Sequence, residues 1–234
     1  MNELNYLITT AIFIGTVHTL IGIDHYVPFI VLSKANAWTM KKTLMIVFVC
    51  GIGHVLSSAV LGFVGIGLSQ SLAYLVDIES LRGTLATYFM IGFGLIYTLW
   101  AIRNTYMNRP HTHLVDGITL EHHHRSIESV DVHHEASPKT NINTLWGLFI
   151  LFVLGPCEPL IPLLMYPASS HNTYAFIAVL GTFSICTLTT MLLATWVGLK
   201  GINAFRLKSL EKHSHTLAGL AITICGVMIL ALGI

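Results

Sequence analysis

The sequence carries very little charge. Only 10% of its 234 residues are Asp, Glu, Lys or Arg, and the formal net charge is +1. A soluble domain carries about 25% charged residues, whereas 54% of this chain is hydrophobic. These values exclude an ordinary soluble domain and predict an integral membrane protein. They give no reason to expect a nucleic-acid partner.

Several catalytic and redox motifs are missing as well. No two of the four cysteines form a CxxC pair, and the sequence contains neither an HExxH signature nor a GxxxxGK[ST] nucleotide loop. We therefore expect neither an enzyme nor a disulfide framework. The first ten residues, "MNELNYLITT", contain no basic n-region and no cleavage site, so we expect the first apolar segment to be retained.

Long apolar runs are abundant. A membrane-spanning helix needs about 20 mostly apolar residues. Six segments meet this length, near 5–33, 43–69, 84–106, 144–169, 172–199 and 215–234. Helices satisfy their own backbone polar groups in lipid, and these runs are too long for barrel strands. The predicted fold is all-α, a polytopic membrane protein with six transmembrane helices.

The basic residues predict the orientation. Eleven of the twelve Lys and Arg residues lie in the first, third and fifth predicted loops, and the remaining one is Arg82. By the positive-inside rule these loops are cytoplasmic. We therefore expect a protein of the cytoplasmic (inner) membrane with both termini on its outer side. The third loop, 107–143, contains seven histidines. We expect it to be flexible and largely disordered, as a metal buffer or delivery segment, with a plain linker as the alternative.

Polar residues interrupt the first predicted helix. The stretch "GTVHTLIGIDHYVPF" places His18, Asp24 and His25 at membrane depth, where ionisable groups are costly and usually functional. On an unbroken helix His18 and His25 would stand about 10 Å apart along the axis. Gly22 weakens the helix and Pro28 removes a backbone donor. The sequence therefore predicts a break that lets the three polar side chains converge.

Two other predicted helices place polar groups at the same depth. His54 lies near the middle of the second, in "CGIGHVLSS", and the fourth contains "LGPCEPLIPLLMYP", whose four prolines predict another broken helix lining a cavity. Imidazoles, carboxylates and a thiol suit a divalent transition metal. The simpler interpretations are a hydrogen-bonding role for His54 and a packing role for Cys157. The predicted metal ligands are His18, Asp24, His25, His54, Glu158 and Cys157.

The acidic residues suggest an internal repeat. Asp24 and Glu158 are the only acidic residues in the six predicted segments, and each precedes a proline by four positions. A repeat of three helices must insert its second copy upside down. We therefore predict a 3+3 inverted repeat, with helices 1 and 4 broken, in which 1–106 and 144–234 are the two copies and 107–143 is the loop between them.

The motifs "HTLIGIDH", the following "GH" and "LGPCEPLIPLLM" resemble those of the nickel/cobalt transporter superfamily, nearest its urease-accessory transmembrane branch. The resemblance implies that His18, Asp24, His25 and His54 bind a transported cation, Ni²⁺ or Co²⁺, with Zn²⁺ as a further candidate. It implies no prosthetic group. It also implies a metallochaperone or urease-maturation partner on the cytoplasmic side, and it leaves the oligomeric state open.

The predicted function is secondary transport of a divalent transition-metal cation across the bilayer. One alternative is a membrane thiol–disulfide electron carrier, because such carriers also have a Gly-Pro-Cys helix start. Against it, Asp24 occupies the place in the first helix where such a carrier would need a cysteine to pair with Cys157. A membrane haem protein and an exporter of another small solute on the same scaffold are two further candidates.

Overall fold

Helices dominate the computed structural model. It describes residues 3–67, 72–107, 111–115, 118–122, 142–155, 157, 159–170, 172–204 and 213–232. Five helices in these ranges are long and apolar enough to cross a membrane: α1 (Glu3–Ile21), α3 (Met40–Gly67), α4 (Leu72–Met107), α7 (Thr173–Ala204) and α9 (Ser214–Leu232). The helices confirm the prediction of a helical, multi-pass membrane protein.

Two of the predicted spans are divided in the middle. The first consists of α1, a 3-10 turn η1 (Ile23–His25) and α2 (Val27–Ala35). Pro28 lies in the first turn of α2, where its missing N–H costs no helical hydrogen bond. The fourth consists of α5 (Ile142–Leu154) and α6 (Leu160–Ser169). Both breaks fall where glycine and proline predict them.

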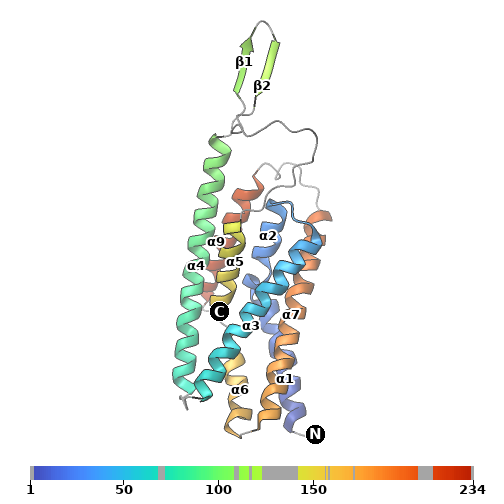
Figure 1. The fold of residues 1–234 in the computed structure, drawn as a ribbon, viewed down its shortest axis with the longest axis vertical. Helices are drawn as coiled ribbons and strands as arrows, with labels where there is room; N and C mark the ends of the chain where they lie inside the picture. Colours follow the sequence, from blue (N-terminus) through green and yellow to red (C-terminus); the bar gives the residue numbers. More distant parts are fainter. Residues whose placement is uncertain are drawn as a thin grey trace.

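The four half-helices are distributed between the two ends of the bundle. Figure 1 shows α2 and α5 toward one end and α1 and α6 toward the other. At the first end, Phe29, Phe152 and Ile222 belong to one buried apolar cluster. At the other end, Leu160 and Phe183 belong to a second. The two breaks therefore lie between two apolar cores, near the middle of the bundle.

The helix α4 begins earlier than the sequence predicts. It runs for 36 residues and includes the stretch "LVDIESLR", for which the sequence allows either a helix on the outer membrane surface or an irregular connector. Glu79 is buried, and Arg82 pairs with it inside the protein. The predicted span 84–106 leaves out this stretch, whereas α4 includes it, because these two charges neutralise each other inside the protein. Asp24 and Glu158 are therefore not the only acidic residues at membrane depth.

Part of the third predicted loop forms a hairpin. Strand β1 (His111–Val115) pairs antiparallel with β2 (Ile118–His122), with His111 opposite His122. The strands extend beyond the end of the bundle in Figure 1. Here the structure differs from the predicted disorder, because the intervening "DG" is a favoured hairpin sequence. The other four histidines of the loop lie outside the described residues.

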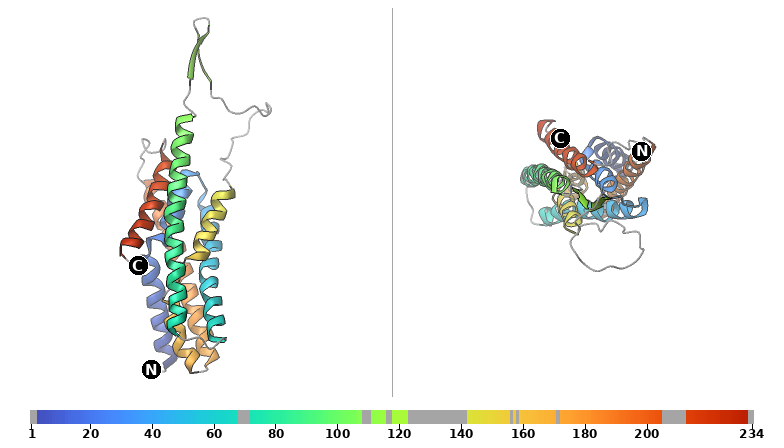
Figure 2. Two further views of the ribbon diagram at one scale, coloured as in Figure 1. Left: turned by 90° about the vertical axis from the view of Figure 1, so that its left-hand side faces the viewer. Right: turned by 90° about the horizontal axis from the view of Figure 1, so that it is seen from above.

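Helices α4 and α9 approach each other through backbone contacts. A Cβ atom added at Gly219 would lie 2.7 Å from the amide nitrogen of Thr98 and 2.9 Å from the carbonyl oxygen of Gly94. In Figure 2 the two helices run side by side. In the same stretch of α4, the hydroxyl of Tyr97 is 2.8 Å from Nδ1 of His215 on α9. Small residues thus allow this pair of helices to pack closely, as is common in membranes.

This contact predicts a large difference between two glycine substitutions. Gly219→Ala should lower the free energy of unfolding by about 1 to 3 kcal/mol, because the new methyl group must push the α4 backbone away. Gly92→Ala on α4 should raise it by up to about 1 kcal/mol, because a Cβ there meets no atom within 4 Å and alanine is the better helix former. Unfolding of the purified protein in detergent measures both. Equal effects would contradict the close contact.

Candidate functional site

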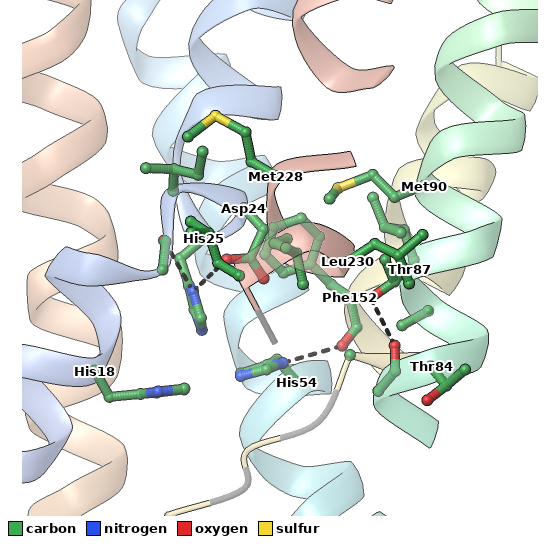
Figure 3. Close-up of a pocket in the computed structure, with 18 of the residues that line it drawn as sticks. His18, Asp24, His25, His54, Thr84, Thr87, Met90, Phe152, Met228 and Leu230 are labelled. Carbon is green, nitrogen blue, oxygen red and sulfur yellow. Dashed lines mark hydrogen bonds and ion pairs between the residues drawn. The ribbon is translucent and has the colours of Figure 1, made fainter. Parts of the chain in front are cut away.

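A cavity of about 490 Å³ lies beside the two helix breaks. Its walls come from the first break, α3, α4, the second break and α9. Figure 3 shows the polar and sulfur-containing side chains that face it. Those labelled are His18, Asp24, His25, His54, Thr84, Thr87, Met90 and Met228.

The turn η1 fixes the orientation of His25. Its Nδ1 lies 3.0 Å from the carbonyl oxygen of Gly22 and 3.1 Å from Oδ1 of Asp24. Because a carbonyl oxygen only accepts hydrogen bonds, Nδ1 carries the proton and donates it. The neutral ring then has its lone pair on Nε2. Gly22 is required here, since a Cβ would lie 2.8 Å from Cε1 of His25 and 3.0 Å from Oδ1 of Asp24.

His54 is held in the same tautomer by the other broken span. Its Nδ1 lies 3.2 Å from the carbonyl oxygen of Phe152, near the end of α5. The last carbonyl groups of a helix have no partner within the helix, so they are free to accept such a bond. Nε2 of neutral His54 is therefore also left with its lone pair. Histidine ligands of metals are oriented in this way.

The three imidazoles lie close together. The ring centroids of His18 and His25 are 5.0 Å apart, and those of His25 and His54 are 5.1 Å apart. The Nε2 atoms of all three rings are buried and lack a hydrogen-bond partner within the described part of the chain. A buried unsatisfied polar group costs about 1 to 3 kcal/mol. Three such atoms at one place indicate a site that binds a proton, an ion or another ligand.

Of the other predicted ligands, Asp24 reaches the cavity and Cys157 does not. The side chain of Asp24 is 34% exposed, and it reaches the cavity beside His25. Cys157 is fully buried, and the described residues that line the cavity do not include it. Glu158 lies outside the described residues. As the described side chains stand, no three from His, Cys, Asp and Glu are close enough together to enclose a metal ion.

A second polar centre was missed by the sequence reasoning. Oε1 of Glu79 accepts hydrogen bonds from the hydroxyl of Ser58 at 2.7 Å and from the amide of Cys157 at 3.0 Å. Arg82 donates to the carbonyl oxygen of Val153 at 3.0 Å. The signal available in the sequence was the spacing of Glu79 and Arg82, three residues apart on one helical face.

The comparisons with known proteins identify a family. No curated protein and no solved structure matches the chain. One family model, described as the cytochrome C biogenesis protein transmembrane region, matches residues 10–228.

This match overturns the resemblance to the nickel/cobalt transporter superfamily and its urease-accessory branch, which rested on three short motifs. It supports the alternative of a thiol–disulfide electron carrier better than metal transport. The match spans nearly the whole chain, so the protein belongs to the family of the cytochrome C biogenesis protein transmembrane region.

Proposed function

We propose that the protein is a membrane carrier of reducing equivalents that works by thiol–disulfide exchange, with Cys157 as its reacting thiol. Family membership supports the reaction class. The position of Cys157 is the observation that carries the proposal. It lies buried in the bundle between α5 and α6, and its neighbours Gly155 and Pro159 line the cavity. All four cysteines are thiols rather than disulfides.

The exchange can be written with one cysteine in the chain. The Cys157 thiolate attacks the disulfide of an acceptor protein, forms a mixed disulfide and releases an acceptor thiolate, which takes up a proton. A thiolate of a donor dithiol then attacks the Cys157 sulfur and releases the second acceptor thiolate, which is also protonated. The other donor thiolate displaces Cys157 and closes the donor disulfide. Two electrons and two protons pass from donor to acceptor.

The histidine cluster suits the proton part of this reaction. Gly155, two residues before Cys157, lies against His54, since a Cβ on Gly155 would be 3.3 Å from Nδ1 of His54. Buried Nε2 atoms with a lone pair accept protons, and Asp24 offers a carboxylate next to His25. In this proposal the cluster holds protons that the thiols release.

Replacing Cys157 tests the carrier. Cys157→Ser should abolish transfer, because the hydroxyl cannot form a mixed disulfide. The measurement is the redox state of a dithiol protein on one side of proteoliposomes after a reductant is added to the other. Cys186→Ser is the matched control, since Cys186 lies in α7 and is only partly buried. Transfer that survives Cys157→Ser would exclude this carrier function.

A second candidate function is binding of a divalent transition-metal ion in the cavity. The observation that favours it is the set of three buried Nε2 atoms without a partner among the described residues, two of them on rings oriented by Nδ1 bonds to carbonyl groups. The ligands would be His18, His25 and His54 with Asp24 as the carboxylate. Glu158 and Cys157 remain members of the predicted set. Nickel, cobalt and zinc all suit imidazole.

Metal analysis of the purified protein tests this second function. His25→Ala and His54→Ala should each lower metal affinity by about tenfold or more, because an imidazole ligand is lost. His213→Ala is the matched control, because His213 is exposed and does not line the cavity. Binding should weaken at acidic pH, where protons compete for the imidazoles. Equal binding by all three variants would contradict the site.

We also infer a 3+3 inverted repeat in the inner membrane. Helix α1 packs on α7 as α5 packs on α3, and α2 packs on α9 as α6 packs on α4. Exchanging the two halves of the chain therefore preserves these four helix contacts. In Figure 1 the half-helices α1 and α5 begin at opposite ends of the bundle, as an inverted repeat requires.

Labelling of introduced cysteines tests the orientation. In a background without native cysteines, a membrane-impermeant reagent added outside cells should label Thr173→Cys and leave Lys41→Cys unlabelled, because the basic loops favour the cytoplasm. Both positions are exposed, at opposite ends of the bundle. Lysis should make Lys41→Cys accessible. The reverse labelling pattern would place the termini in the cytoplasm and the hairpin outside.

A further inference from the structure

The structure assigns a positioning role to Glu79 and Arg82. We propose that this pair fixes the backbone at the end of α5 and inside the break between α5 and α6, and thereby holds Cys157 in place. The inference rests on the proposed function only in treating Cys157 as the reacting thiol. The geometry of the pair stands independently of that reaction.

Arg82 holds the end of α5. Its Nη2 donates to the carbonyl oxygens of Val153 at 3.0 Å and Gly155 at 3.3 Å. It also donates to the hydroxyl of Ser57 on α3 at 2.9 Å. These carbonyl groups lie where the helix stops, so they lack a partner four residues further on. A planar guanidinium group with five donors can satisfy several acceptors at once, which a lysine cannot do.

Glu79 holds the middle of the same break. Its Oε1 accepts the amide hydrogen of Cys157 at 3.0 Å, and Ser58 on α3 donates to the same oxygen at 2.7 Å. The other carboxylate oxygen, Oε2, is bonded to Arg82. The side chain of Glu79 is 2% exposed. Thus α3 and α4 together fix the residues immediately before and at Cys157.

The first break is held in a different way. Its hydrogen bonds, within the described residues, come from neighbours along the chain: the amide of His25 bonds to Gly22, that of Tyr26 to Ile23, and the hydroxyl of Tyr26 to Leu20. On α9, which packs against this break, the cavity-lining residues are apolar, including Met228 and Ile229. One break is therefore fixed by charges from another helix, and the other can rearrange locally.

Two variants separate positioning from folding. Arg82→Lys keeps the charge but lacks the planar fork, and Glu79→Gln combined with Arg82→Gln removes both charges. The double variant leaves no buried unpaired charge, so it is expected to fold. Asp77→Asn is the matched control, because Asp77 is an exposed acidic residue two positions from Glu79 on the same helix. Thermal unfolding in detergent checks each protein.

The measurement is the rate at which a small thiol reagent labels Cys157 in the full-length protein. In one background Cys50, Cys186 and Cys225 are alanine, so that only Cys157 reacts. A parallel background retains only Cys50, which is 2% exposed on α3 and reports general loosening. Labelling needs no electron transfer, so its result can be read even when the carrier function fails.

We expect Cys157 to be labelled about tenfold faster or more in Arg82→Lys and in the double variant, because hydrogen bonds to charged groups then no longer hold the break closed. Labelling of Cys50 should stay unchanged, as should labelling of Cys157 in Asp77→Asn. An unchanged rate at Cys157 would overturn the proposal. So would an equal rise at Cys50, or a rise confined to variants that unfold, since either result shows a purely structural pair.

Discussion

Backbone groups that are released inside a membrane must find partners within the protein, because the bilayer core supplies no water. In this chain, backbone groups lose their helical hydrogen-bond partners at two helix breaks. Imidazoles bond the carbonyl groups of Gly22 and Phe152, and Arg82 bonds those of Val153 and Gly155. The cavity, the tautomers of the histidines and the buried ion pair all depend on this requirement.

The arrangement joins a family scaffold to an unusual set of side chains. The family indicates thiol–disulfide chemistry, yet the first break contains Asp24 and His25 where a dithiol carrier would need a second cysteine. The second break contains Cys157, and its backbone lies against His54. The proposed reacting thiol and the buried imidazoles thus lie within one bundle, so the proposed electron and proton transfers would involve neighbouring groups.

Local signals in the sequence were sufficient for the breaks and for much of the cavity. Gly22 and Pro28 act on their own segment, so the convergence of His18 with His25 could be predicted. The spacing of Glu79 and Arg82 allows an ion pair, but its partners Ser58 and Cys157 could not be predicted, because they come from distant parts of the chain. The sequence pattern places Glu79 and Arg82 in the second predicted loop, so the predicted span 84–106 covers only part of α4. The family was misidentified because three short motifs cover little of the chain, whereas the family match extends from residue 10 to residue 228.

The length of α4 has a mechanical consequence. An uninterrupted helix of 36 residues spans about 54 Å, more than the thickness of the hydrocarbon layer. Near one end it carries the ion pair, and toward the other it meets His215 through Tyr97. Because α4 is continuous and makes contacts toward both ends, a tilt of the helix displaces both ends rather than being taken up by a bend. A displacement of one end of α4 would therefore move the residues at its other end as well.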